Sequence, residues 1–269
     1  MQQTLFLLII ICYILKATME SKPQLDAFGV IRVLMGIFLC LICVWLAIQL
    51  VFPGQTKIPG AEPSPFVFVL NTFSFQIITI CFVAVFLKQN GIRWRDIFGF
   101  LNSSLWRVIL FGVIGFIIFV PLGLELQYLT VLLIKALAGS SAPVESQVVV
   151  QILQKNPPLS YLTLIAISTI ILAPVAEEIL FRGLLYRTLK DAGHPLIAIY
   201  GVSLLFGIIH NNLVAALPLA FFGVILTIVY EITGNLLAPI LTHSLFNLMN
   251  FTMLMYDYNF ESLFKRFSG

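Results

Sequence analysis

Eight apolar runs make up most of the chain, and they leave few alternatives for its fold. They cover about residues 3–18, 27–52, 66–87, 106–137, 159–189, 195–210, 213–232 and 236–256. Most of them approach or exceed the ~20 residues that an α-helix needs to cross a bilayer. Breaks rich in proline, glycine and asparagine separate the runs, as expected between helices. We therefore predict an all-α integral membrane protein, a bundle of about eight transmembrane helices.

The composition excludes several classes of protein. Of the 269 residues, 60% are hydrophobic and only 10% are charged, whereas a soluble domain is about 45–50% apolar and about 25% charged. A soluble enzyme, a disordered chain and a nucleic-acid-binding protein are excluded, because each needs far more polar surface. The expected surroundings are the lipid bilayer, with no nucleic-acid partner.

The apolar runs divide the chain into four parts. Residues 1–137 are expected to form about four transmembrane helices, with the first run retained because no basic segment precedes it. Residues 138–158 form an extramembrane loop, residues 159–256 a helical core that carries the polar motifs, and residues 257–269 a C-terminal tail. The candidate chemistry is therefore expected in the second half of the chain.

Two adjacent carboxylates lie inside the fifth apolar run. Ionisable side chains at membrane depth are costly, so each is a candidate functional group. Glu178 and Arg182 are four residues apart on one helical face and are expected to pair. Glu177 points about 100° away around the helix, so Arg182 does not obviously neutralise it. A desolvated carboxylate without a cation is suited to general-base chemistry, which makes Glu177 the leading candidate.

Two histidines in later apolar runs complete the candidate site. His210 closes the sequence Phe206-Gly-Ile-Ile-His, and His243 is followed four residues later by Asn247. A single buried histidine is usually only a hydrogen-bonded core residue. Two histidines together with an uncompensated glutamate favour a catalytic site.

The depth of these residues can be compared by counting along the helices. Fourteen residues separate Glu177 from Asp191, and fifteen separate Pro195 from His210, so in an antiparallel hairpin both side chains lie about 21–23 Å from the turn. His243 lies only about 12 Å beyond the next turn, so straight helices would leave it far from Glu177. Tilted helices, or a break near Pro218 or Gly223, would be needed to bring it closer.

Taken in order, the motifs E-E-x-x-x-R, F-x-x-x-H and H-x-x-x-N resemble those of the CPBP family. This family contains the CAAX-type prenyl-protein endopeptidases and their bacterial, bacteriocin-processing relatives. The resemblance covers about residues 174–250. It implies an eight-spanning glutamate-type intramembrane protease, a hydrolase that cleaves a membrane-associated protein or peptide. The expected location is the bacterial inner membrane.

The resemblance also implies a role for each motif residue. Glu177 corresponds to the main catalytic carboxylate, and His210 to its partner in activating water. His243 and Asn247 correspond to the pair that stabilises the oxyanion. The supporting positions are matched by Glu178, Arg182 and Phe206.

Three alternatives remain open at this stage. No cofactor is expected, but Glu177, His210 and His243 are also possible zinc ligands, which would make the same protease a metalloenzyme. A non-enzymatic membrane scaffold or immunity protein could use the same fold to bind a partner. A small transporter that relays protons through Glu177 and His210 is the least favoured, because no inverted repeat is evident.

Overall fold

The computed structural model describes residues 25–52, 65–100, 103–138 and 158–255, and all regular secondary structure in these residues is helical. The helices within residues 25–138 are α2 (Ala27–Val51), α4 (Pro65–Gln89), α5 (Trp94–Phe98) and α6 (Leu105–Ala138). The helices within residues 158–255 are α8 (Leu159–Ile167), η2 (Ser168–Leu172), α9 (Ala173–Glu178), η3 (Ile179–Tyr186), α10 (Arg187–Asp191), α11 (Pro195–Ile208), α12 (Leu213–Thr233) and α13 (Leu237–Met255).

Seven of the eight apolar runs coincide with helices in the part of the chain that the structure describes. The run at 3–18, the tail at 257–269 and most of the loop at 138–158 lie outside the described residues. Five of the described helices are long and apolar enough to cross a membrane. The described part of the chain is therefore all-helical, as expected for an integral membrane protein, and contains five candidate spans; it does not confirm the expected count of about eight.

The fifth apolar run forms one continuous helix that contains two π-helical segments. The segments α8, α9 and α10 are α-helical, whereas η2 and η3 between them are π-helical. A π-helix hydrogen-bonds from residue i to i+5 and is rare outside short segments, which occur frequently at functional sites. Glu177 and Glu178 occupy the short α-helical stretch between the two π segments.

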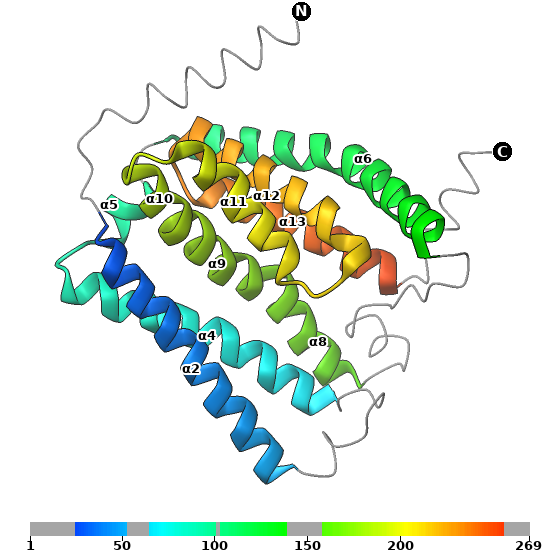
Figure 1. The fold of residues 1–269 in the computed structure, drawn as a ribbon, viewed down its shortest axis with the longest axis horizontal. Coiled ribbons are helices and arrows are strands. Elements are labelled where there is room, and N and C mark those ends of the chain that lie inside the picture. Colours follow the sequence, from blue (N-terminus) through cyan, green and yellow to red (C-terminus); the bar gives the residue numbers. More distant parts are fainter. Residues whose placement is uncertain (1–24, 53–64, 101–102, 139–157, 256–269) are drawn as a thin grey trace, which may run out of the picture.

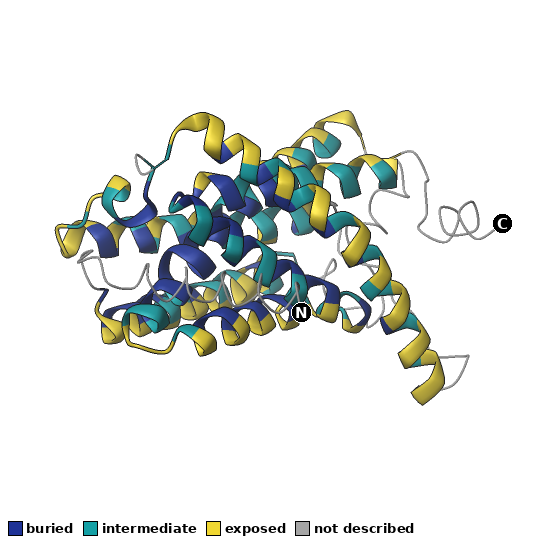
Figure 2. Ribbon diagram, turned by 90° about the horizontal axis from the view of Figure 1, so that it is seen from above, coloured by how far each residue is buried: buried dark blue, intermediate teal, exposed yellow. Residues whose placement is uncertain are grey.

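This composite helix runs through the middle of the bundle (Figure 1). On one side α2 and α4 pack together, with α4 against the composite helix, and on the other side α6 packs against α12 and α13. Buried residues are concentrated where these groups meet, and exposed ones cover the outer helices (Figure 2). Most of the exposed side chains are large and apolar, as expected for helices that face lipid. The polar motifs therefore lie in the part of the molecule with the least access to lipid.

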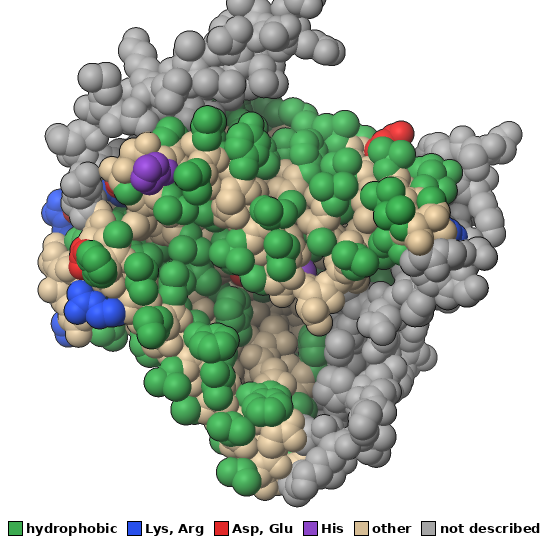
Figure 3. Space-filling view, viewed as in Figure 1, with side chains coloured by type: hydrophobic (Ala, Val, Ile, Leu, Met, Phe, Trp, Pro, Cys, Tyr) green, Lys and Arg blue, Asp and Glu red, His purple; other side chains and the backbone are tan. Residues whose placement is uncertain are grey.

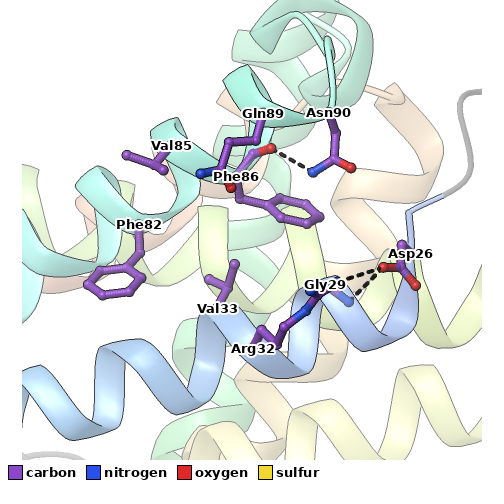
Figure 4. Close-up of a pocket in the computed structure, with 9 residues that line it drawn as sticks. All are labelled: Asp26, Gly29, Arg32, Val33, Phe82, Val85, Phe86, Gln89 and Asn90. Atoms are coloured by element: carbon purple, nitrogen blue, oxygen red, sulfur yellow. Dashed lines mark hydrogen bonds and ion pairs between the residues drawn. The ribbon is translucent and has the colours of Figure 1, made fainter.

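A pocket of about 390 Å³ opens between α2 and α4 at the end that carries Asp26 and Asn90 (Figure 4). Asp26 caps α2 by accepting hydrogen bonds from the amides of Phe28 and Gly29. The pocket contains none of the motif residues. We assign it no chemical role, because its polar groups are exposed and Asp26 already has partners.

Candidate active site

The two carboxylates of the composite helix have different partners. Glu178 and Arg182 are fully buried, and a guanidinium nitrogen lies 2.8 Å from Glu178 Oε1, so the expected pair is present. Arg182 also donates to the carbonyl oxygen of Gly223 at 2.9 Å and stacks on the Phe206 ring at 4.8 Å. Glu177 remains outside this pair, and its Oε2 is buried without a hydrogen-bond partner among the described residues.

His210 lies in the turn after α11, two residues past the end of that helix at Ile208. The sequence analysis placed it inside the helix, whereas the helix ends two residues earlier. Its Nδ1 lies 2.6 Å from the carbonyl oxygen of Phe206. A carbonyl oxygen only accepts, so Nδ1 carries the proton of the neutral ring. Nε2 then has a free lone pair and lies 3.9 Å from Glu177 Oε2.

His243 approaches the same carboxylate from α13. Its Nδ1 lies 2.9 Å from Glu178 Oε1, the oxygen that also binds Arg182. The pair of Glu178 and Arg182 therefore fixes the orientation of the imidazole through Nδ1. Its Nε2 lies 3.9 Å from Glu177 Oε2. The rings of Phe206 and Phe222 contact the imidazole edge-on and surround it with apolar surface.

The Nε2 atoms of both histidines therefore point to one oxygen of Glu177. Both distances exceed the length of a direct hydrogen bond, so Glu177 Oε2 is not hydrogen-bonded to either histidine. The exposed fraction of the side chain is 27% for His210, 14% for Glu177 and 4% for His243. The site is thus most accessible beside His210 and most enclosed beside His243.

Asn247 lies one turn after His243 on α13, and its Nδ2 donates to the carbonyl oxygen of Thr169 at 2.8 Å. An amide nitrogen carries two hydrogens, so this bond orients the group and leaves one N–H for another acceptor. Phe206 contributes twice, since its carbonyl binds His210 and its ring covers Arg182. The structure thus joins the three sequence motifs through a connected set of contacts.

His243 reaches the carboxylates although a count along straight helices predicts a mismatch in depth. Helix α12 continues unbroken through Pro218 and Gly223, so the break considered from the sequence is absent. Instead, the amide of Leu236 donates to the carbonyl oxygen of Phe98 at 2.9 Å. The Phe98 ring in turn packs against Gly183.

The end of α12 lies beside the last turns of the composite helix, because Tyr230 contacts the Tyr186 ring and Glu231 pairs with Lys190. The imidazole of His243 nevertheless lies 2.9 Å from Glu178 without a break in α12, so a count along straight, parallel helices misjudges its depth.

The donor set was compared with the requirements of a zinc site. Among the described residues, no group of three or more His, Cys, Asp or Glu side chains is arranged to hold a metal ion. Ligands at 2.0–2.1 Å from a tetrahedral zinc are roughly 3.4 Å apart. Both Nε2 atoms lie 3.9 Å from Glu177 Oε2. These two separations are about 0.5 Å longer than those between the ligands of a tetrahedral zinc.

One buried polar contact near the site escaped the sequence analysis. Gln76 of α4 is fully buried and donates through Nε2 to both the carbonyl oxygen and the hydroxyl of Ser168. An amide inside an otherwise apolar run was the available signal, but no motif connects it with residues 92 positions later in the chain.

Residues 159–249 match the family model described as type II CAAX prenyl endopeptidase Rce1-like. The matched segment begins with α8, ends within α13 and includes every motif residue that the sequence analysis selected. No curated protein and no solved structure gave a match. The family match confirms, for this segment, the resemblance inferred from the motifs.

Proposed function

We propose that the protein is a glutamate-type intramembrane endopeptidase that hydrolyses a peptide bond in a membrane-associated protein or peptide. The observation that carries this proposal is the convergence of two imidazole Nε2 atoms on the unpaired carboxylate oxygen of Glu177. This arrangement lies inside the segment that matches the endopeptidase family. The proposed location is the bacterial inner membrane.

Glu177 and His210 are the groups that would activate water. A water molecule beside Glu177 Oε2 gives its proton to the carboxylate, and its oxygen attacks the substrate carbonyl carbon. When the carbon–nitrogen bond breaks, the leaving nitrogen needs a proton. His210 is suited to relay it, since its Nε2 faces Glu177 while its Nδ1 is held by the Phe206 carbonyl. The products are a new carboxyl terminus and a new amine.

His243 and Asn247 are suited to stabilise the tetrahedral oxyanion. As an imidazolium, His243 presents an Nε2–H donor whose direction is fixed by the bond from Nδ1 to Glu178. Asn247 adds its second amide hydrogen, since the first is bound to the Thr169 carbonyl. Donors that are already oriented in an apolar site stabilise a developing negative charge strongly, because little reorganisation is needed.

Water and substrate need a route to these groups. The space-filling view shows a hollow near the middle of the face drawn in Figure 1, with small areas of acidic and histidine side chain at its upper edge (Figure 3). Apolar side chains surround this opening. An apolar, extended segment of a membrane-associated substrate fits such surroundings better than a soluble, charged peptide does.

The proposal is tested by comparing the C-termini of membrane proteins in cells that carry wild-type protein, Glu177→Gln or His210→Ala. We expect C-termini that depend on the wild type and disappear in both variants, because removal of a general base costs about 10²–10⁴-fold in rate. The matched control is Glu125→Gln, which changes an exposed glutamate on α6. It should leave the C-termini as in wild type.

Retention of the same new C-termini in Glu177→Gln would contradict a catalytic role for the carboxylate. A cellular phenotype that survives in both inserted, folded variants would instead favour a scaffold or immunity protein. Accumulation in the membrane and resistance to thermal unfolding establish that each variant is folded.

The metal-free mechanism has a separate test. We expect wild-type protein purified in a strong chelator, with metal analysis below stoichiometry, to keep its Glu177-dependent cleavage. Loss of activity that is restored by added zinc would contradict the mechanism and favour Glu177, His210 and His243 as zinc ligands.

A further inference from the structure

The π-helical segment η2 changes the hydrogen bonding of two neighbouring carbonyl groups, those of Ser168 and Thr169. The amide of Ala173 donates to the carbonyl oxygen of Ser168, five residues earlier, which closes the wide turn. The next residue is Pro174, which has no amide hydrogen. The carbonyl of Thr169 therefore cannot receive the corresponding bond from the residue five positions later, and buried carbonyls require a partner.

Two amide side chains from other helices bind these carbonyls. Gln76 of α4 donates to the Ser168 carbonyl oxygen at 3.1 Å and to the Ser168 hydroxyl at 2.8 Å. Asn247 of α13 donates to the Thr169 carbonyl oxygen at 2.8 Å. The segment η2 is therefore tied to α4 on one side and to α13 on the other. Gln76 is 1% exposed, so water does not compete for this bond.

The winding of η2 sets the direction of the catalytic carboxylate. A π turn holds one residue more than an α turn, and each residue corresponds to about 100° of rotation around a helix. If η2 relaxed to an α-helix, α9 would turn by about that angle relative to α8. Glu177 lies nine residues after Ser168, so such a turn would move its carboxylate away from His210.

We propose that Gln76 is a positioning residue for the active site. Its amide stabilises the π-helical winding of η2. This winding holds Glu177 beside the two histidines, and it holds the Thr169 carbonyl where Asn247 binds it. The inference rests on the proposed function for its effect on catalysis, whereas the effect on η2 itself does not. It extends the site to α4, which lies outside the family-matched segment.

Thr79 provides a matched control on the same helix. It lies one turn from Gln76, is equally buried, and its hydroxyl has no hydrogen-bond partner among the described residues. If α4 acted only through close packing, isosteric changes at the two positions would have similar effects. If the amide of Gln76 stabilises η2, only the change at Gln76 should alter the hydrogen exchange of η2 and the rate of cleavage.

Hydrogen exchange of the full chain in detergent micelles tests the effect on η2 without any substrate. We expect Gln76→Met, which keeps the length of the side chain but removes both donors, to speed exchange of peptides covering residues 166–178 by about tenfold. Thr79→Val should leave this segment as in wild type. Unchanged exchange in Gln76→Met would overturn the proposal. If that variant does not accumulate, Gln76→Asn is used, because it keeps an amide but withdraws it by one methylene.

Kinetics test the effect on Glu177, with a quenched peptide that the wild-type protein cleaves in a Glu177-dependent manner. We expect Gln76→Met to lower kcat by about 10- to 100-fold, as for a misplacement approaching 1 Å, and to change KM less than twofold. The pH profile of kcat should also shift, because the ionisation of Glu177 depends on its distance from the histidines.

The shift in pH profile separates positioning from loss of folded protein. A smaller amount of folded enzyme scales the profile down without moving it, and that result would contradict the proposal. The two hypotheses fail separately. If Glu177→Gln is inactive and Gln76→Met is fully active, the positioning role of Gln76 is wrong and the proposed protease function is retained. If hydrogen exchange at η2 changes in Gln76→Met but no Glu177-dependent cleavage is found, the proposed protease function is wrong.

Discussion

At the scale of single residues, the ion pair of Glu178 and Arg182 is fully buried and therefore costly to desolvate. Neither side chain has exposed surface. Removing two charges from water costs several kcal/mol per ion, and their attraction repays this only with good geometry and further hydrogen bonds. Gly223 and the Phe206 ring supply some of these contacts for the guanidinium, and His243 binds the carboxylate. The contact of Glu178 Oε1 with His243 Nδ1 lets the pair hold the imidazole in one orientation.

Removing one partner of this pair should be worse than removing both. We expect Arg182→Met to destabilise the protein by about 3–5 kcal/mol, because Glu178 is left as an uncompensated buried charge. The double variant with Glu178→Gln should recover most of that loss. Unfolding by denaturant in micelles measures the free energy of unfolding of the single and the double variant. Lys135→Met, at an exposed position, is the control.

Cleavage in the double variant separates stability from orientation. Activity should stay low even where stability recovers, since the charged acceptor that holds His243 Nδ1 is gone. Full activity in the double variant would contradict the orienting role of Glu178.

At the scale of the helices, close approach between α11 and α12 depends on the absence of side chains. A Cβ atom added at Gly207 would overlap the carbonyl oxygen of Ala216, a backbone atom that has little freedom to move. Gly201, six residues earlier on α11, has open surroundings, and its nearest neighbour would be a side-chain atom at 3.6 Å. Because α11 leads directly into the turn with His210, its separation from α12 also determines where His210 lies.

These two glycines give a paired prediction. We expect Gly207→Ala to cost about 1–3 kcal/mol of stability through overpacking. It should also lower kcat, because the added methyl group pushes α11 away from α12 and moves His210 with it. Gly201→Ala should be neutral or stabilise by about 0.5–1 kcal/mol, because alanine favours a helix interior over glycine. Thermal unfolding and peptide cleavage of the two variants provide the comparison. Equal behaviour of the two would show that this helix contact does not position His210.

At the scale of the whole molecule, the first half of the chain completes the site that the second half carries. Thr242, next to His243, donates to the carbonyl oxygen of Gly112 on α6 at 2.8 Å. The turn before α13 is bound by the backbone of Phe98, and η2 is bound by Gln76. These contacts come from helices outside residues 159–249, the segment that matches the protease family.

The matched segment should therefore not work alone. We expect a fragment of residues 158–255 to lack cleavage even when inserted in the membrane, because α13 and η2 lose their partners. Co-expression with a fragment of residues 1–138 should restore Glu177-dependent cleavage at least in part. Detection of new C-termini in membranes measures both cases, and wild-type activity of the short fragment alone would contradict this view.

Much of the fold was accessible from the sequence, because hydrophobic runs and breakers are local properties. Seven predicted runs match described helices, and the i,i+4 pair of Glu178 and Arg182 is present. The motif order led to the family that the comparison confirms. The catalytic roles of Glu177, His210, His243 and Asn247 remain predictions until the variants are measured.

Other features depended on contacts between distant parts of the chain. Counting residues placed His243 too far from Glu177, because the count assumed straight, parallel helices, whereas the packed helices bring the imidazole to Glu178 without a break in α12. The π-helical winding at η2 also had no clear sequence signal, since Pro174 alone does not tell which amide will bind the freed carbonyl. The sequence by itself determined that the chain lies in a bilayer and which polar groups it places there. Only the tertiary structure decided which of those groups meet, because a meeting point in a bundle depends on helix tilt, turn depth and cross-helix hydrogen bonds.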